Sequence, residues 1–320
     1  MEYRYLGRTG LKVSELCLGS MQFGWTADVP LSYQILENAF EAGINFIDTA
    51  DIYSTWVEGN PGGVAETIIG NWLKRSGIPR DQIIIATKVR GRMGDGPNDE
   101  GLSRAHIMNA VEGSLRRLKS EYIDLYQTHW YDENTPIEQT LYALDDLILQ
   151  GKVRYIGCSN YPAWRLTESL WKAERNRLAR YDSIQPHYNL VHRAEFEREL
   201  ADICRIYGIG VIPYSPLAGG FLTGKYHKGI LTKGARSKGA QRYFNDQNWT
   251  LLEKIEALAQ KKYGYSISQI ALAWLLSDPV ITSPIIGPRS LEQLEDNLGA
   301  VGVRLSAEEK DTLDEACNWE

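Results

Sequence analysis

The chain has 320 residues, of which 43% are hydrophobic, and its formal net charge is −6. This acidic balance, with no dense run of Lys or Arg, argues against a nucleic-acid-binding surface and favours small solutes as partners. The longest apolar stretches, such as 270–276, fall far short of the ~20 residues that span a bilayer, and Met1 is followed by no apolar leader, so we expect a cytoplasmic protein that no membrane holds.

Short apolar segments alternate with longer amphipathic ones from beginning to end. The first expected element is a β-hairpin over residues 3–13, placed to close the floor of a barrel. Eight strand candidates follow, at 15–19, 45–48, 83–88, 123–129, 153–159, 183–185, 210–214 and 281–286. Helix patterns lie between them, at 31–42, 64–76, 103–118, 136–150, 162–176, 194–207 and 266–277.

This alternation predicts an α/β fold of the (β/α)8 TIM-barrel type, with residues 1–320 forming a single domain. Gly43, Gly77, Gly151 and Gly208 come just after four helix patterns, where a left-handed capping residue is wanted. An open doubly wound sheet also fits the alternation, but its usual glycine-rich turn after the first strand is missing.

A long loop is expected after the seventh strand, over residues 218–248. Its Gly219-Gly220 and Gly224-Lys225 pairs suit a close approach of the backbone to a phosphate. The alternative is an ordinary solvated loop.

Four polar residues stand at or just beyond the ends of successive strand candidates. Asp48, Lys88 and His129 are separated by 40 and 41 residues, about one strand, one helix and two loops each, and Tyr53 follows Asp48 by five. In a parallel sheet these side chains emerge at the same end. The four cysteines are scattered without paired spacing, and we expect them to be reduced and buried.

These residue types suit proton transfer to a carbonyl oxygen. A tyrosine hydroxyl, with a pKa of about 10, is a poor acid near neutral pH. The Lys88 ammonium is expected to lower the pKa of Tyr53, Asp48 to hold Lys88, and His129 to donate to the substrate carbonyl. No convincing nucleophile and no metal cage stand beside them, so we expect no metal and a hydride from a bound nicotinamide.

A family resemblance supports this interpretation. Residues 43–53, Gly-Ile-Asn-Phe-Ile-Asp-Thr-Ala-Asp-Ile-Tyr, resemble the aldo-keto reductase signature, and segments 86–88, 124–129 and 151–160 extend the similarity in the right order. Segment 213–220 is similar to the bacterial aryl-alcohol-dehydrogenase-like and potassium-channel-β-subunit-like branches. The resemblance covers nearly the whole chain and implies NADP(H)-dependent carbonyl reduction on a (β/α)8 barrel, with Asp48, Tyr53, Lys88 and His129 as the catalytic tetrad.

The same resemblance implies a cofactor seat. Ser159, Asn160 and Gln185 match residues that hold the nicotinamide carboxamide, and Tyr214 matches the aromatic residue that stacks on its ring. The segment 286–297 leads from a strand into a helix N-terminus, which favours an anion. Residues for the pyrophosphate, the 2′-phosphate and the adenine are expected to be Ser215, Leu217, Gly219, Lys225, Gly287, Arg289, Gln293, Asp296 and Asn297. Lys225 is equally interpretable as a surface lysine, and Gly287-Pro288 stands where many relatives carry a Lys-Ser pair, which leaves the strictness of NADPH over NADH open.

Aromatic residues gather on the predicted mouth loops, where they would wall an apolar pocket for a small carbonyl substrate. They are Trp25, Trp56, Trp130 and Tyr131. The substrate itself, the preferred direction and the oligomeric state stay open. Two other functions are compatible with these residues: an NADP(H)-sensing regulatory protein with slow turnover, and an aldolase that uses Lys88 as a Schiff-base lysine.

Overall fold

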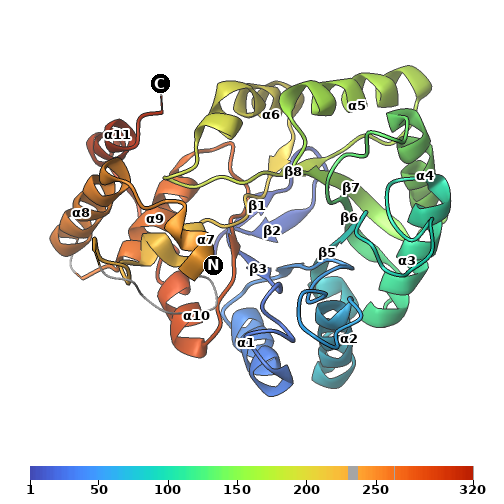
Figure 1. The fold of residues 1–320 in the computed structure, drawn as a ribbon, viewed down its shortest axis with the longest axis horizontal. Coiled ribbons are helices and arrows are strands. Elements are labelled where there is room, and N and C mark those ends of the chain that lie inside the picture. Colours follow the sequence, from blue (N-terminus) through green and yellow to red (C-terminus); the bar gives the residue numbers. More distant parts are fainter. Residues whose placement is uncertain (230–236, 263, 320) are drawn as a thin grey trace.

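The strands close into a barrel. The computed structural model describes residues 1–229, 237–262 and 264–319, and its main sheet has eight parallel strands in the order β10-β3-β4-β5-β6-β7-β8-β9. The Thr282 amide donates to the Val211 carbonyl (2.8 Å) and the Ile285 amide to the Pro213 carbonyl (2.9 Å), which joins the two edges of the sheet. The protein is therefore a (β/α)8 barrel, as predicted, and the open doubly wound sheet is excluded (Figure 1).

The barrel strands are β3 (Cys17–Gly19), β4 (Phe46–Asp48), β5 (Ile84–Val89), β6 (Ile123–Thr128), β7 (Val153–Ser159), β8 (Ser183–Gln185), β9 (Gly210–Val211) and β10 (Ile285–Ile286). Two predicted strands are shorter than expected, those at 210–214 and 281–286. Pro213 and Pro284 interrupt them, because proline has no backbone N–H to donate to a ladder. The first strand is also shorter, since it starts at Cys17 instead of residue 15.

The predicted helices are all present, with ends within two residues of the expected ones when the π-helical turn at Phe196–Leu200 is counted with α6. The four glycines that follow predicted helices all have positive φ, which confirms the left-handed conformation expected at these helix ends; they are Gly43, Gly77, Gly151 and Gly208. The helices are α1 (Val29–Glu41), α2 (Val64–Ser76), α3 (Arg104–Leu118), α4 (Ile137–Leu149), α5 (Ala163–Asn176), α6 (Ala201–Tyr207), α7 (Ser237–Gln241), α8 (Asp246–Lys261), α9 (Ile267–Ser277), α10 (Leu291–Leu298) and α11 (Ala307–Ala316).

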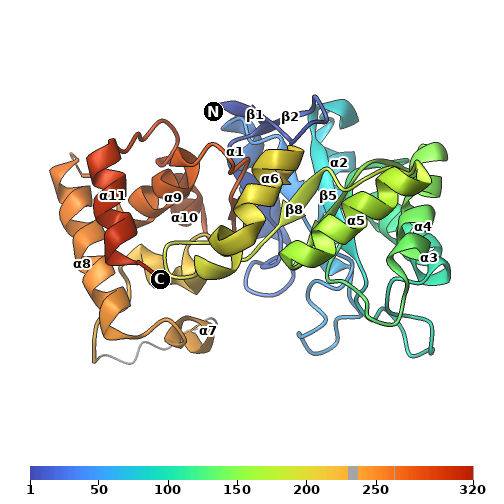
Figure 2. The ribbon, with the colours of Figure 1, turned by 90° about the horizontal axis from the view of Figure 1, so that it is seen from above.

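A β-hairpin closes one end of the barrel. β1 (Tyr3–Tyr5) pairs antiparallel with β2 (Lys12–Ser14), as predicted. Leu6 and Val13, both fully buried, pack with Cys17 and Phe46 in the apolar cluster inside the barrel. Figure 2 shows the hairpin at one end of the molecule and α7 with the long loops at the other. The floor is thus apolar and sealed, and the mouth lies at the carboxyl ends of the strands.

Alternation along the strands builds the barrel interior. In β6, Leu125 belongs to the inner apolar cluster and Tyr126 to the outer one, between barrel and helices. The same alternation in β4 and β5 turns Asp48 and Lys88 inward. Apolar side chains therefore fill the lower barrel, and polar ones replace them towards the mouth.

The expected loop at 218–248 is partly helical. Its residues 230–236 lie outside the described part of the chain, whereas α7 and the start of α8 fall within the described part. The sequence analysis missed α8 and α11, which lie side by side outside the ring (Figure 1). They were missed because the alternation of one strand and one helix does not require them. Over the described residues, no helix combines the length and apolar character needed to cross a membrane.

Candidate active site

The tetrad residues meet at the mouth. The Lys88 ammonium donates to Asp48 Oδ2 (2.5 Å), to the Thr49 carbonyl (2.9 Å) and to the Tyr53 hydroxyl (3.0 Å). Lys88 is fully buried and Asp48 is 1% exposed, so each charge depends on the other for compensation. The His129 ring lies edge-on to the Tyr53 ring, with the centroids 6.1 Å apart.

Burial and charge set the protonation states in this group. Pairing with Asp48 and Tyr53 raises the pKa of Lys88 against the opposing effect of burial, so Lys88 is an ammonium. Burial, followed by the charges of Lys88 and Arg90, holds the pKa of His129 well below its usual range, so the imidazole is neutral. Lys88 does act to lower the pKa of Tyr53, as expected, but burial outweighs it and the pKa of Tyr53 lies above its ordinary value. On that point the sequence-based expectation was wrong.

These states bear on the Schiff-base alternative. A Schiff-base lysine must be a neutral amine with a free electron pair. The Lys88 ammonium donates its three N–H groups to Asp48, Thr49 and Tyr53, so its nitrogen has no free electron pair. The geometry therefore favours proton transfer at Tyr53 over covalent catalysis at Lys88.

The other oxygen of Asp48 accepts from two amide side chains. Gln185 Nε2 donates to Asp48 Oδ1 at 2.8 Å and Gln127 Nε2 donates at 3.2 Å. The sequence analysis missed Gln127. Its signal was the alternation in β6, where Gln127 is the inward residue after Leu125, beside Lys88 in the sheet.

Ser159, Asn160, Gln185 and Tyr214 form one hydrogen-bonded group beside the tetrad. The Ser159 hydroxyl donates to the Gln185 carbonyl (2.8 Å), and Asn160 Nδ2 donates to the His129 carbonyl (2.9 Å) and to Ser159 Oγ (3.0 Å). The Tyr214 hydroxyl donates to Asn160 Oδ1 (2.9 Å). Since these donors and the Gln185 amide group are already used, the group offers a ligand mainly acceptor oxygens, which suits the NH₂ end of a carboxamide.

One elongated cavity connects this group with α10. It has a volume of about 860 Å³. All predicted cofactor residues line it, as do Asp48, Tyr53 and His129, while Lys88 lies buried beneath. Gly220, Ile286 and Pro288, which lie in segments that the sequence analysis singled out, line it too. The cavity also has walls that the sequence analysis did not identify: Gly19, Ser20, Met21, Gln22, Ile52, Pro216, Thr223, Ser266, Ser268 and Ile285.

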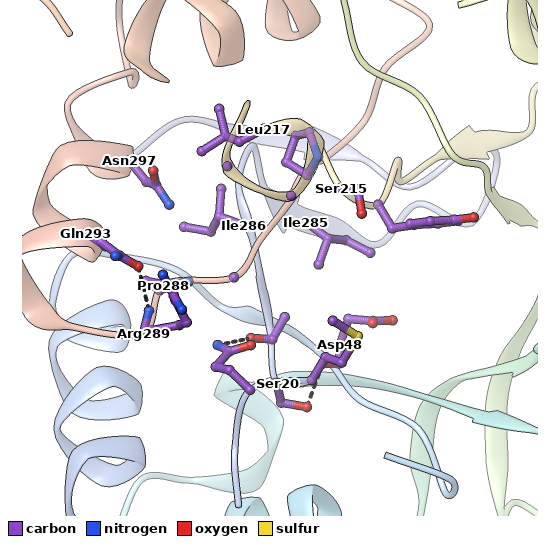
Figure 3. A pocket seen from close by; sticks show the side chains of 18 of the residues that line it. Ser20, Asp48, Ser215, Leu217, Ile285, Ile286, Pro288, Arg289, Gln293 and Asn297 are labelled. Carbon is purple, nitrogen blue, oxygen red and sulfur yellow. Dashed lines mark hydrogen bonds between the residues drawn. The ribbon is translucent and has the colours of Figure 1, made fainter. Parts of the chain in front are cut away.

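The far end of the cavity is built by α10. Figure 3 shows Gln293 and Asn297 projecting from this helix, Arg289 beside Gln293, and Asp48 at the opposite end of the cavity. Ser290 caps the helix by accepting from the Gln293 amide, and Gln293 Oε1 accepts from the Arg289 amide (3.0 Å). Lys225 and Arg289 supply positive charge along the cavity, as an anionic ligand requires.

Backbone strain gathers around the mouth. Ser54, Asn160, Ser215 and Ala218 have φ between +49° and +73°, a region that side chains other than glycine seldom adopt. Asn160 and Ser215 line the cavity, and Ser54 and Ala218 each directly follow a lining residue. A strained backbone conformation costs energy, so it is kept only where the surrounding contacts hold it, and such conformations are common at functional sites.

Aromatic rings wall the cavity above Tyr53. Trp130 stacks on His129 (centroids 3.9 Å apart), and Trp56 lies edge-on to Tyr53 (6.2 Å). Trp56 and Trp130 line the cavity, as predicted, but Trp25 and Tyr131 are not among the described residues that do. Trp25 packs edge-on against Trp56 (5.7 Å), and Tyr131 packs edge-on against Tyr161 and Trp164.

Comparison with known proteins gives a consistent result. The model of the aldo/keto reductase family matches residues 15–318. A Bacillus subtilis (strain 168) protein described as the uncharacterized oxidoreductase YrpG is 42% identical over 313 residues, which span 96% of this chain and 93% of that protein.

Two further relatives differ in description. A protein of Oryza sativa subsp. japonica described as a probable voltage-gated potassium channel subunit beta is 37% identical over 310 residues, 95% of this chain and 92% of its own. The versiconal hemiacetal acetate reductase of Aspergillus parasiticus is 35% identical over 342 residues, 98% of this chain and 96% of its own.

Proposed function

The chain belongs to the aldo/keto reductase family of oxidoreductases, and we propose that it reduces aldehydes or ketones to alcohols with NADPH, with Tyr53 as the proton donor. The observation that carries the proposal is the contact between the Tyr53 hydroxyl and the buried Lys88 ammonium at 3.0 Å, at one end of a long cavity. A small carbonyl compound is the substrate class that this group suits.

The side chains divide the work of proton transfer. Because Lys88 donates to the Tyr53 oxygen, the Tyr53 proton is left for an acceptor in the cavity. Loss of that proton leaves a phenolate beside an ammonium, and Asp48 holds the ammonium in place. Neutral His129 supplies a second donor to the same carbonyl oxygen, and the rings of Trp56 and Trp130 give the cavity an apolar wall beside it.

The cavity fits a nicotinamide dinucleotide at both ends. Acceptor oxygens of Gln185 and Asn160 suit its carboxamide, and His187 stacks on Tyr214 (5.0 Å, 11°), which lines the cavity and can pack against the nicotinamide ring. Arg289, Gln293 and Asn297 suit a 2′-phosphate and an adenine. A cofactor of this kind, typical of the family, would supply a hydride to the carbonyl carbon.

The test is Tyr53→Phe, which removes the hydroxyl and keeps the ring. Carbonyl reduction is expected to fall by about 10²-fold or more, the usual worth of a general acid, while the NADPH dissociation constant stays nearly unchanged. Turnover is measured by NADPH absorbance and binding by fluorescence. Turnover like that of the wild type would refute Tyr53 as the donor.

A second candidate function is NADP(H) sensing with slow turnover. It is favoured by the similarity to proteins described as probable potassium channel β subunits, 37% identical to this chain in rice and in Arabidopsis thaliana. Single-turnover oxidation of bound NADPH by an aromatic aldehyde separates the two. Rapid decay supports the reductase, and persistence of bound NADPH supports the sensor.

A further inference from the structure

We propose that Gln127 is a positioning residue of this site, which holds the Asp48–Lys88–Tyr53 chain in the arrangement in which Tyr53 gives up its proton. This inference rests on the proposed function only in taking Tyr53 as the proton donor. Gln127 has no role in the proton transfer or the cofactor binding described above.

The fold places Gln127 inside the polar layer of the barrel. Gln127 pairs with Lys88 of β5 on one side and with Gly157 of β7 on the other, and it is fully buried. A Cβ on Gly157 would come within 3.3 Å of Gln127 Cγ and 2.4 Å of Ser183 Oγ. The missing side chain at Gly157 therefore leaves room for the Gln127 side chain beside it.

The hydrogen bonds fix the orientation of both amides. Asp48 Oδ2 accepts from Lys88 (2.5 Å), while Asp48 Oδ1 accepts from Gln185 (2.8 Å) and Gln127 (3.2 Å). Gln127 Oε1 in turn accepts weakly from Gln185 (3.4 Å). Asp48 is thus a carboxylate held by an ammonium on one oxygen and by two amides on the other.

This arrangement bears directly on Tyr53. The negative charge of Asp48 holds the Tyr53 proton more tightly, whereas Lys88 loosens it. The other titratable groups whose charges act with Tyr53 or Lys88 are Cys17 of β3, Asp51 after β4, the neutral imidazole of His129 and Tyr214 after β9. Two amide N–H groups on Oδ1 offset part of the Asp48 charge, so they weaken its hold on the Tyr53 proton.

Gln127→Met keeps the length of the side chain and removes the donor. Asp48 then acts on Tyr53 with more of its charge, and we expect the pKa of Tyr53 to rise by about one unit. The alkaline limb of carbonyl reduction moves upward by the same amount. Below that limb kcat falls, with KM nearly unchanged, because Tyr53 has become a weaker acid.

Thr128→Val is the matched control. Thr128 is the next residue in β6, is equally buried and donates to Tyr181 (3.3 Å) on the outer side of the barrel. Thr128→Val therefore also removes buried hydrogen bonding in β6, but at a hydroxyl group that bonds Tyr181 and not Asp48. If the role of Gln127 were purely structural, Gln127→Met and Thr128→Val would both lower the stability of the protein, and neither would change the Tyr53 pKa.

The readout is an NMR titration of full-length protein with tyrosine labelled at the hydroxyl-bearing carbon, with NADP⁺ present and absent. The Tyr53 signal is assigned by its loss in Tyr53→Phe. A higher pKa in Gln127→Met than in the wild type and in Thr128→Val supports the inference, and equal values in all three overturn it.

Gln127→Leu covers the case in which Gln127→Met fails to fold. It is also apolar and close in volume to Met, and it removes the same donor without adding a charge, so the Tyr53 pKa is again expected to rise; an unchanged value overturns the inference. Because the titration needs no carbonyl substrate, it separates the two hypotheses. If the wild type reduces no carbonyl compound but Gln127→Met raises the Tyr53 pKa, only the proposed function is refuted. If the wild type reduces carbonyl compounds and Gln127→Met leaves the Tyr53 pKa unchanged, only the role of Gln127 is refuted.

Discussion

Lys88 shows how a single residue keeps a charge in the barrel interior. An ammonium without a partner would lose its proton on complete burial, but three acceptors within 3.0 Å keep it charged. The residue type and position were evident from the sequence. The sequence did not show that burial affects the pKa of Tyr53 more than the Lys88 charge does, because it does not reveal how many atoms surround each group.

Asp51 is a buried carboxyl for which the proposed mechanism has no use. Its two oxygens have no hydrogen-bond partner of good geometry in the part of the chain that the structure describes. Burial, followed by the negative charge of Glu66, raises the pKa of Asp51 well above its ordinary value. The folded protein therefore keeps a proton there that the unfolded chain releases.

The sign of the pH dependence follows. Above about pH 4 the unfolded chain releases the Asp51 proton, so the stability of the fold decreases as the pH rises towards the raised pKa of the folded state. Asp51→Asn removes this loss and is expected to increase the free energy of unfolding at neutral pH by on the order of 1 kcal/mol, because each tenfold difference in proton affinity between the folded and unfolded states is worth about 1.4 kcal/mol. Urea unfolding at acidic and neutral pH measures it.

Asp95→Asn is the control, since Asp95 is exposed in the loop after β5 and its change is expected to leave stability within about 0.5 kcal/mol. A neutral-pH stability for Asp51→Asn below that of the wild type would contradict the prediction, because it would show that the Asp51 charge stabilises the fold.

Among the elements, α10 illustrates what periodicity predicts. The spacing of Gln293, Asp296 and Asn297 indicated one helical face, and all three line the cavity. The bounds of β9 and β10 were less predictable, because proline positions in the ladder decide where hydrogen bonding stops. α8 and α11 were missed because α8 packs mainly on α9 and α11, and α11 mainly on α8, away from the barrel strands.

Arg289→Ala tests the ligand end of α10. If Arg289 meets the 2′-phosphate, its loss removes one charge-assisted contact of about 1.5 to 3 kcal/mol, or about 10- to 100-fold in the NADPH dissociation constant. The NADH dissociation constant is expected to change little, since NADH has no 2′-phosphate. Fluorescence titration with both nucleotides measures the ratio.

The control for this experiment is Arg304→Ala, which removes an exposed arginine paired with Glu2 (2.7 Å) and leaves the cavity intact. Equal weakening of NADPH and NADH in Arg289→Ala would indicate contact with the adenine or general damage to α10. An unaltered NADPH constant would remove Arg289 from the site.

The whole molecule separates stability from chemistry along the barrel axis. The hairpin lies at the floor (Figure 2), where its apolar side chains pack into the barrel, and the cavity lies at the mouth. Leu6 is fully buried at the floor, so Leu6→Ala is expected to lower the free energy of unfolding by about 2 to 5 kcal/mol. kcat and KM are expected to stay within about twofold of wild type at temperatures where the variant is folded.

Leu149→Ala is the matched substitution on the surface, because Leu149 of α4 is 78% exposed and its change is expected to cost about 0.5 kcal/mol or less. Denaturant unfolding and steady-state kinetics on the same preparations give both quantities. A changed KM in Leu6→Ala would show that floor and mouth are coupled.

The sequence by itself determined the strand-helix order, the inward direction of Asp48 and Lys88, and the residues that the mouth brings together, because side-chain periodicity and strand spacing are local properties of the chain. Only the tertiary structure decided that Gln127 and Gln185 share Asp48, that Trp25 and Tyr131 are not among the described residues that line the cavity, and that Tyr53 holds its proton more tightly than in water. These depend on the stagger between neighbouring strands and on burial, which arise when distant segments pack together.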